Sequence, residues 1–252
     1  MTSRFDRILY VPLRISFDKQ RLLDEALNIP AQHFDFQKTY WYGNTFESSV
    51  EYFDGLVVGD ESENRDFPRL YVESGEVKYT SVGKGRSFRV VHLSHAPDEP
   101  QSLTKAVKFE NGNFTRLRLK QAGNWRLRND LEIPHIKNLI ECMPFTELSL
   151  IRLCVYEPGT FTPAHRDEPN QLYKQAGYHI INVVLQDGGV QMVVRSGGHD
   201  YHATEDSYLF DFSFPHGVPP AKSQRVVLCM EGKLNCQRAE DLLDQSRLIY
   251  AD

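Results

Sequence analysis

Two histidines and one aspartate have the spacing of a metal site. His165 and Asp167 form an H-x-D motif, and His216 follows later in the chain. Alternate side chains of an extended strand share a face, so His165 and Asp167 would project together toward one metal ion. A third ligand from another strand, His216, would complete one face of an octahedron and leave the opposite face for other ligands. Two imidazoles and one carboxylate favour a mononuclear iron(II), whereas thiolates would favour zinc.

The H-x-D motif alone is weak evidence, because a solvated histidine and a turn aspartate often have this spacing by chance. Arg225 adds support, since it follows His216 and leads into the apolar residues 226–229. An arginine there can bind a dicarboxylate through paired, charge-assisted hydrogen bonds. The ordinary alternative is a surface arginine at a strand edge. Taken with the three ligands, Arg225 predicts a site for a metal ion and a dicarboxylate.

The order of these motifs resembles that of the iron(II)/2-oxoglutarate-dependent dioxygenases, and most of all the aspartyl/asparaginyl-hydroxylase-like branch that includes bacterial cis-proline hydroxylases. The matching motifs are Tyr-Glu-Pro-Gly at 156–159, Phe-Thr-Pro-Ala-His-Arg-Asp at 161–167, Phe-Pro-His-Gly at 214–217, and Arg225. The resemblance is firm over residues 148–230. It implies a double-stranded β-helix in which His165, Asp167 and His216 bind Fe(II). It also implies that Arg225 pairs with the distal carboxylate of 2-oxoglutarate and that O2 is consumed.

The same resemblance implies hydroxylation of an unactivated C–H bond, with release of succinate and CO2. Asp167 fills the carboxylate position and leaves no vacancy for a halide, so hydroxylation is favoured over halogenation; desaturation or ring closure would need the same residues. The expected substrate is a free amino acid or an amino-acid derivative. Two alternatives stay open: hydroxylation of a residue in a peptide or protein, and a cupin-like metal-binding protein without 2-oxoglutarate turnover.

Four more residues are candidates for the site. Arg152 and Tyr156 share one face of a strand, where Arg152 could bind a substrate carboxylate and Tyr156 could contact 2-oxoglutarate; a polar face turned to solvent is an equal alternative. Asn182 stands where the family often has an arginine or histidine that helps to hold the cosubstrate, and its amide could bond a carboxylate oxygen. Glu168 could receive a substrate amine, although a solvated loop carboxylate is the simpler interpretation.

The elements that would position these residues are mainly strands with flanking helices. Short apolar segments bounded by turn residues predict strands at 148–156, 178–186, 190–195, 207–212 and 224–230. Strands at this spacing are typical of a jelly-roll or barrel-like double sheet. Helices are predicted at 18–27, 134–143 and 238–250. The aromatic stretch 33–42 favours strand, residues 61–101 favour hairpins and loops, and His199 and His202 are expected in a polar loop.

One catalytic domain over residues 1–252 is expected. Residues 1–146 would form N-terminal strands and helices that support the core, residues 147–232 the double-stranded β-helix core with the metal site, and residues 233–252 a C-terminal helix. The interpretation of 147–232 as a double-stranded β-helix follows from the family resemblance.

Composition excludes several classes of protein. With a net charge of -5 and a pI near 6.0, the chain gains little attraction toward nucleic acid or anionic membranes, so a small-molecule substrate is the simpler expectation. The N-terminus does not have the pattern of a signal peptide, and no segment approaches the roughly 20 apolar residues that span a bilayer. The four cysteines lack the close pairing of a zinc site, and we expect free thiols in a reducing cytoplasm.

Overall fold

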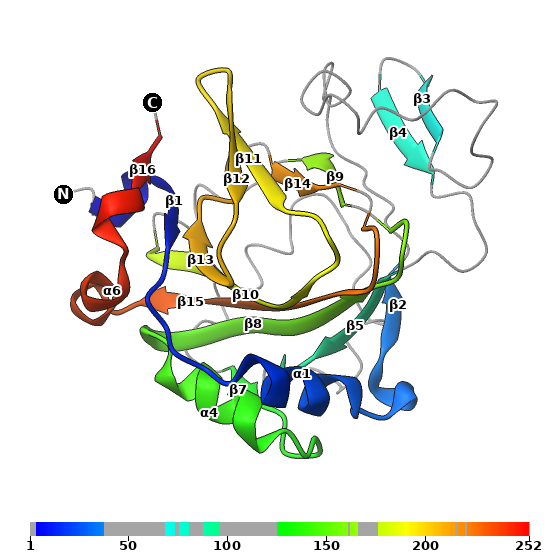
Figure 1. Ribbon diagram of the computed structural model, residues 1–252, viewed down its shortest axis with the longest axis vertical. Coiled ribbons are helices and arrows are strands. Elements are labelled where there is room, and N and C mark those ends of the chain that lie inside the picture. Colours follow the sequence, from blue (N-terminus) through cyan, green and yellow to red (C-terminus); the bar gives the residue numbers. More distant parts are fainter. Residues whose placement is uncertain are drawn as a thin grey trace.

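The computed structural model describes most of the chain, with gaps. The described residues are 4–37, 69–73, 76–80, 88–95, 125–160, 162–165, 176–214, 216–219 and 221–251. Among them, residues 6, 35–37, 69–73, 76–80, 88 and 163–165 are described by their backbone alone. Strands dominate these ranges, and two helices lie together along one side of them (Figure 1).

Most strands belong to two antiparallel sheets (Figure 1). The large sheet contains β1 (Ile8–Pro12), β2 (Asp35–Gln37), β5 (Phe88–His92), β8 (Phe145–Tyr156), β10 (Tyr178–Asp187), β13 (Ser207–Phe210), β15 (Arg225–Leu234) and β16 (Ile249–Tyr250). The small sheet contains β9 (Thr162–His165), β11 (Met192–Ser196), β12 (His199–Ala203) and β14 (His216–Val218). Two separate ladders pair β3 (Arg69–Glu73) with β4 (Glu76–Thr80) and β6 (Ser94–His95) with β7 (Arg126–Leu127).

The order of the strands defines the fold. In the large sheet it is β16-β1-β13-β10-β15-β8-β5-β2, and in the small sheet it is β12-β11-β14-β9. Between β8 and β15 the chain therefore passes back and forth between the sheets, placing β8, β10, β13 and β15 in one and β9, β11, β12 and β14 in the other. This winding is the double-stranded β-helix, or jelly roll. The fold class expected from the sequence is confirmed.

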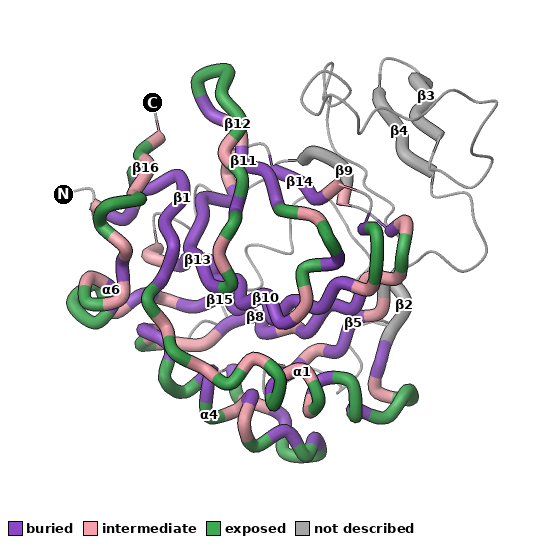
Figure 2. The backbone as a smooth tube through the Cα atoms, in the orientation of Figure 1, coloured by how far each residue is buried: buried purple, intermediate pink, exposed green. Residues whose placement is uncertain are grey.

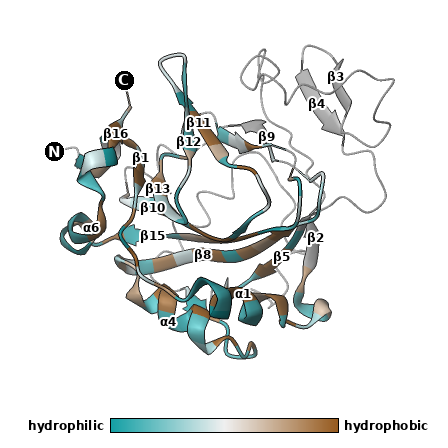
Figure 3. Cartoon of the chain, in the orientation of Figure 1, coloured by the Kyte–Doolittle hydropathy of each residue, from teal (hydrophilic) through white to brown (hydrophobic). Residues whose placement is uncertain are grey.

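The large sheet separates two apolar clusters. Its outer face packs against α1 (Lys19–Leu27) and α4 (Pro134–Cys142), and Leu22, Ile136 and Leu153 share one buried cluster. Its inner face packs against the small sheet, where Val184 of β10 and Val194 of β11 share a second cluster. Figure 2 shows β8, β10, β13 and β15 of the large sheet largely buried, and Figure 3 shows brown, hydrophobic segments along β8 and β5. Functional groups on the inner face are thus enclosed between two sheets.

The start of α4 is capped by a residue of α1. Pro134 is the first residue of α4, and the preceding Ile133 has no side chain that can accept a hydrogen bond. The carboxylate of Glu25 replaces the missing cap, accepting from the backbone N–H groups of His135 at 3.0 Å and Ile136 at 2.6 Å. A carboxylate at a helix N-terminus also interacts favourably with the helix dipole. Glu25 therefore joins the two helices beneath the large sheet.

Replacing Glu25 with alanine is expected to lower the free energy of unfolding by about 1–2 kcal/mol, since both N–H groups lose their acceptor. A urea titration followed by circular dichroism measures the change. Glu141→Ala is the matched control, because Glu141 is an exposed carboxylate of α4, the helix that Glu25 caps. Equal effects of the two substitutions would show that the cap contributes nothing.

The helices predicted at 18–27 and 134–143 are confirmed as α1 and α4. Asp18 caps α1 by accepting a hydrogen bond from the backbone of Arg21 at 3.0 Å. The helix predicted at 238–250 is wrong in its second half. α6 (Cys236–Leu242) ends early and is followed by the 3-10 turn η4 (Gln245–Arg247) and by β16, which pairs with β1.

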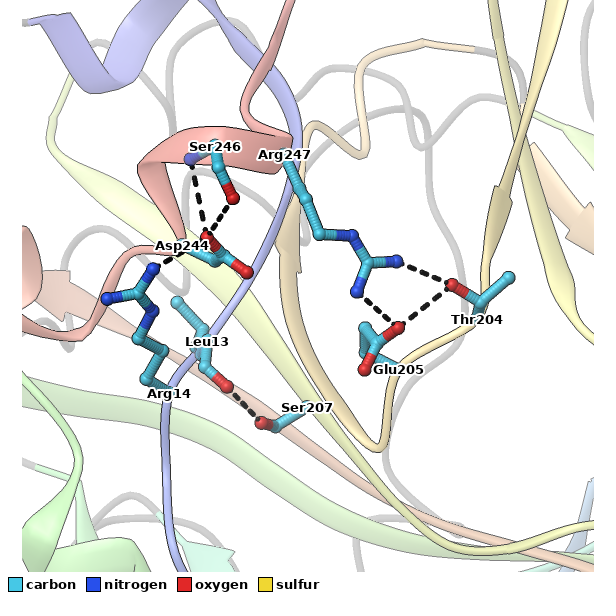
Figure 4. Close-up of polar contacts among 8 residues, drawn as sticks. All are labelled: Leu13, Arg14, Thr204, Glu205, Ser207, Asp244, Ser246 and Arg247. Carbon is cyan, nitrogen blue, oxygen red and sulfur yellow. Dashed lines mark hydrogen bonds and ion pairs between the residues drawn. The ribbon is translucent and has the colours of Figure 1, made fainter.

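Polar contacts explain why the C-terminal helix ends early (Figure 4). The backbone N–H of Asp244 donates to Pro12 in β1, so it is withdrawn from the helical pattern. The Asp244 carboxylate accepts from the hydroxyl of Ser246 at 2.7 Å and from Arg14 at 2.9 Å. Beyond it, Arg247 donates to the hydroxyl of Thr204 at 2.9 Å. These contacts turn the chain toward the edge of the large sheet.

The predicted strands match β8, β10, β11, β13 and β15, with shifts of a few residues at their ends. The loop expected around His199 and His202 is wrong, because these residues form β12, which pairs along its whole length with β11. Within 33–42 the structure describes a strand at β2, and residues 38–42 lie outside the described ranges. Within 61–101, β3 and β4 form a hairpin ladder, and β5 and β6 follow.

The four cysteines form no disulfide: Cys154 and Cys229 are buried, and Cys142 and Cys236 are exposed. Burial raises the pKa of the Cys154 thiol to about 12, so this group stays protonated on the inner face of the large sheet. Among the helices of the described ranges, none has the length and apolar character needed to cross a bilayer.

Candidate active site

The small sheet brings the two predicted histidine ligands side by side. His216 begins β14 and His165 ends β9, and the two residues are Cα partners in this antiparallel pair. Directly opposed residues of neighbouring strands lie within about 5.5 Å of each other. The backbone therefore provides the proximity that a shared metal ion requires. Asp167 lies outside the described residues, as does Glu168, and their roles stay predictions.

The imidazole of His216 is held in one orientation. It is 6% exposed, and its Nδ1 lies 2.9 Å from the backbone oxygen of Phe214. A carbonyl only accepts hydrogen bonds, so Nδ1 carries the proton and Nε2 is the basic nitrogen. The edge of the Phe210 ring packs against the imidazole, with 5.2 Å between ring centroids. A histidine whose Nδ1–H bonds to a backbone carbonyl is the form that binds metals through Nε2.

Within the described ranges, no three histidine, cysteine or acidic side chains gather into a metal-binding group. Asp167 lies outside these ranges, and His165 is described by its backbone alone. The donor set predicted from the sequence still fits the residues present: the fixed Nε2 of His216 suits iron(II), and Cys154, on the inner face of the large sheet, offers a protonated thiol rather than the thiolate that zinc prefers.

Arg225 is a buried cation without a carboxylate partner among the described residues. It is 3% exposed at the start of β15, so the alternative of a surface arginine is wrong. Its Nη1 donates to the backbone oxygens of Asp187 at 3.2 Å and Val190 at 3.4 Å, and its Nε has no hydrogen-bond partner within the described part of the chain. Burying an uncompensated charge costs several kcal/mol. A bound anion would offset that cost, which is the role predicted for a dicarboxylate.

Gly188 lets the chain pass against Arg225. Its φ is +68°, and a Cβ added there would lie 2.7 Å from the Cβ of Arg225 and 3.0 Å from the backbone oxygen of Ser223. These distances are shorter than side chains tolerate. The turn between β10 and β11 therefore needs glycine at this position, both for its conformation and for the space that Arg225 occupies.

Gly188→Ala is expected to displace Arg225 and to weaken binding of a dicarboxylate, with a loss of stability of roughly 1–3 kcal/mol from overpacking and backbone strain. Gly198→Ala is a close control, because Gly198 has a φ of +79° but no atom of the described residues lies within 4 Å of an added Cβ. Thermal unfolding and calorimetric titration with 2-oxoglutarate would measure both effects. If both variants bound the ligand equally well, the contact with Arg225 would not matter.

Arg152 and Tyr156 face inward, as the sequence alternation predicts. They lie on the side of β8 opposite Leu153, and Tyr156 is the Cα partner of Arg225 on β15. Arg152 is the Cα partner of Cys229. Both side chains are partly buried, on the face that looks toward the small sheet. Burial raises the pKa of Tyr156, so its phenol stays protonated and can donate a hydrogen bond.

Asn182 also faces inward, whereas His179 is directed to the other face of β10, as predicted from their spacing. Asn182 is 7% exposed, and its amide nitrogen lies 3.3 Å from the hydroxyl of Tyr208. Sequence reasoning missed Tyr208, which lies in the predicted strand 207–212 and is fully buried. The pairing of β13 with β10 places it beside Asn182, and the sequence has no local signal for that contact.

No family model matches the chain, and no curated protein matches its sequence. Among solved structures, the chain is similar to a prolyl hydroxylase from Trichoplax adhaerens in complex with a peptide fragment of the hypoxia inducible factor oxygen degradation domain (14% identity, 93% of this chain and 86% of that chain, TM-score 0.41). It is also similar to a 2OG-Fe(II) oxygenase family oxidoreductase from Burkholderia pseudomallei (11% identity, 89% of this chain and 96% of that chain, TM-score 0.39). Another similar structure is a prolyl-4-hydroxylase from Pseudomonas putida (14% identity, 60% of this chain and 73% of that chain, TM-score 0.31). The strand order of the chain itself makes it a double-stranded β-helix protein.

Proposed function

We propose that this protein is an iron(II)/2-oxoglutarate-dependent dioxygenase that hydroxylates an unactivated C–H bond of a small molecule. The observation that carries the proposal is the cross-strand pairing of His216 with His165 in a double-stranded β-helix whose inner face also holds the buried Arg225. A metal site beside a buried, uncompensated cation suits a cosubstrate that chelates the metal at one end and carries a negative charge at the other.

In this proposal, His165, Asp167 and His216 hold Fe(II), and Arg225 binds the distal carboxylate of 2-oxoglutarate. Bound iron would supply the activation of O2, for a reaction that converts 2-oxoglutarate, O2 and the substrate to succinate, CO2 and the hydroxylated substrate. Tyr156 lies next to Arg225 and donates a hydrogen bond to the cosubstrate from its protonated phenol.

The residues of the chain position the reactants and exclude water. The hydrogen bond from Nδ1 of His216 to Phe214 holds the imidazole, so that its other nitrogen would be the one to bind the metal. Val184 and Val227 form an apolar floor on the inner face of the large sheet, where electrostatic attraction between Arg225 and a carboxylate is stronger than in water. The cosubstrate is therefore fixed at its charged end before the substrate arrives.

We further propose that the substrate is a free amino acid or a small amino-acid derivative. Arg152 lies on the inner face, and we assign it the substrate carboxylate and Glu168 the substrate amine. Hydroxylation of a peptide or protein residue is the alternative within the same class, and it would use the same metal ligands. A cupin-like metal protein without 2-oxoglutarate turnover is the alternative outside it, but a metal site alone gives no reason for burying Arg225.

The test is a substrate screen under defined conditions. The protein is loaded with iron(II) without oxygen, mixed with 2-oxoglutarate and a panel of amino acids and derivatives, and exposed to air. Mass spectrometry is expected to find succinate, together with a product heavier by one oxygen atom for at least one compound. Pyruvate, which lacks the distal carboxylate, is the control cosubstrate and is not expected to support the reaction. Absence of both 2-oxoglutarate binding and succinate formation would favour the cupin-like alternative.

A further inference from the structure

Glu231 is a carboxylate on the enclosed face of the large sheet. It lies near the end of β15 and is only 5% exposed. Side chains alternate along a strand, so Glu231 faces the same way as Val227 and Cys229, which belong to the apolar cluster between the two sheets. Its Cα partner on β10, Ile180, belongs to the same cluster. A carboxylate is rarely buried in such surroundings unless positive or donor groups offset the cost of desolvation.

The register of the sheet places Glu231 within reach of the proposed metal site. Phe210 of β13, Ile180 of β10 and Glu231 of β15 are Cα partners in one row across three neighbouring strands. Neighbouring strands lie about 4.8 Å apart, so roughly 10 Å separates the backbones of Phe210 and Glu231. The ring of Phe210 packs against the imidazole of His216, the predicted metal ligand. A small molecule bound at the metal site can therefore also reach Glu231.

Arg152 of β8 supplies the opposite charge on the same face. It is the Cα partner of Cys229, so it lies diagonally across from Glu231, where two long side chains can contact one small ligand. Burial raises the pKa of the Cys154 thiol and of the Tyr156 phenol, and the charge of Arg152 opposes both shifts. This cation therefore acts along β8 on the side away from Glu231. The inner face thus has a positive and a negative group at separate but neighbouring positions.

We propose that Glu231 binds the ammonium group of the substrate, and that the substrate is therefore an amino acid whose amine is free. This inference rests on the proposed function and narrows its substrate class. An ammonium group has three N–H donors, so it can bond to Glu231 and to the predicted Glu168 at once, while Arg152 binds the carboxylate of the same molecule. A residue inside a peptide chain has an uncharged amide in place of the amine. Glu231 therefore favours a free amino acid over a peptide.

The test compares compounds that differ only in having an amine or a hydroxyl group. Protein loaded with Mn(II) and 2-oxoglutarate is screened by thermal unfolding against the common amino acids and the corresponding 2-hydroxy acids, and calorimetry then gives dissociation constants. At least one amino acid is expected to bind the wild type more tightly than its hydroxy acid. Glu231→Gln is expected to weaken binding of that amino acid about tenfold or more, because a hydrogen bond between charged groups is lost. Binding of the hydroxy acid and of 2-oxoglutarate is expected to stay the same, which also shows that the variant is folded.

Glu147→Gln is the matched control. Glu147 lies at the same end of the β8–β15 pair, and its carboxylate accepts from the Tyr178 hydroxyl at 2.9 Å and from Lys233 at 3.2 Å. This variant is expected to bind the amino acid and the hydroxy acid as the wild type does.

An unchanged amino-acid affinity of Glu231→Gln, or an equal loss for the amino acid and the hydroxy acid, would overturn the role of Glu231. A wild-type protein that bound 2-oxoglutarate but bound no amino acid more tightly than its hydroxy acid would do the same. Each of these results leaves the proposed dioxygenase standing. A wild-type protein that did not bind 2-oxoglutarate would overturn both proposals.

Discussion

Replacing His216 with alanine is expected to lower the rate of 2-oxoglutarate turnover by at least about 100-fold. Even the loss of a residue that only supports a metal ligand lowers metal affinity or activity by up to that factor. His216 is the best-defined predicted ligand: it is buried, its Nδ1 proton is committed to Phe214, and its ring is packed against Phe210. Iron content after anaerobic loading and succinate release in air measure the two expected losses, of metal and of activity.

His202→Ala is the control for that experiment. His202 lies on β12 of the same small sheet, but its side chain is exposed. This variant is expected to bind iron and to release succinate as the wild type does. If His216→Ala retained the iron and the turnover, the assignment of His216 as a ligand would be wrong. If both variants lost metal alike, the loss would report damage to the small sheet rather than removal of a ligand.

Replacing Arg225 with alanine is expected to weaken binding of 2-oxoglutarate by roughly 30-fold or more. This factor corresponds to about 2 kcal/mol, which is the low end of the cost of removing one partner of a buried charge pair. Lysine at this position keeps the charge but loses the planar fork of donors, so Arg225→Lys is expected to fall between wild type and alanine. Calorimetry on Mn(II)-loaded protein gives the dissociation constants. Arg195→Ala, which removes a surface ion pair with Asp200 on the small sheet, is the control.

Thermal unfolding separates this role of Arg225 from a structural one. Ligand that binds the folded protein raises its melting temperature, so 2-oxoglutarate is expected to stabilise the wild type and not Arg225→Ala at the same concentration. Without ligand, the substitution removes a buried charge that has no carboxylate partner among the described residues, and the loss of stability is expected to be small. A large loss without ligand, together with unchanged 2-oxoglutarate affinity, would contradict the clamp.

The strands that carry the site were predictable because their sequences have local signals. In β8, residues alternate between the two faces, which places Arg152 and Tyr156 together, and β10 and β15 are apolar runs bounded by turns. Two other strands have no such signal. β1 is buried at all five positions, so its side chains do not alternate, and β12 has mostly exposed side chains and is held by its ladder with β11. Their structure comes from partners distant in the sequence.

The site shows the same division between local and non-local information. His216 and Arg225 could be selected because their residue types and their positions next to strands suggest chemistry. The contact of Asn182 with Tyr208 could not be predicted, because it depends on the register of β13 against β10. The register of two strands cannot be deduced from a single sequence. The assignments of Asp167 and Glu168 stay predictions, because both residues lie outside the described ranges.

The position of β1 has a consequence for how the chain folds. This early strand pairs with β13 on one side and with β16 on the other, and the backbone of Ala251 donates to Arg7 at 2.8 Å. During synthesis on the ribosome, the segment that forms β1 emerges long before either partner exists. Contacts between segments so distant in sequence slow folding, and the apolar β1 segment stays exposed until β13 and β16 have been synthesised. We therefore expect this edge of the large sheet to close late in folding. Until it closes, the exposed apolar segment of β1 would be a binding site for a chaperone.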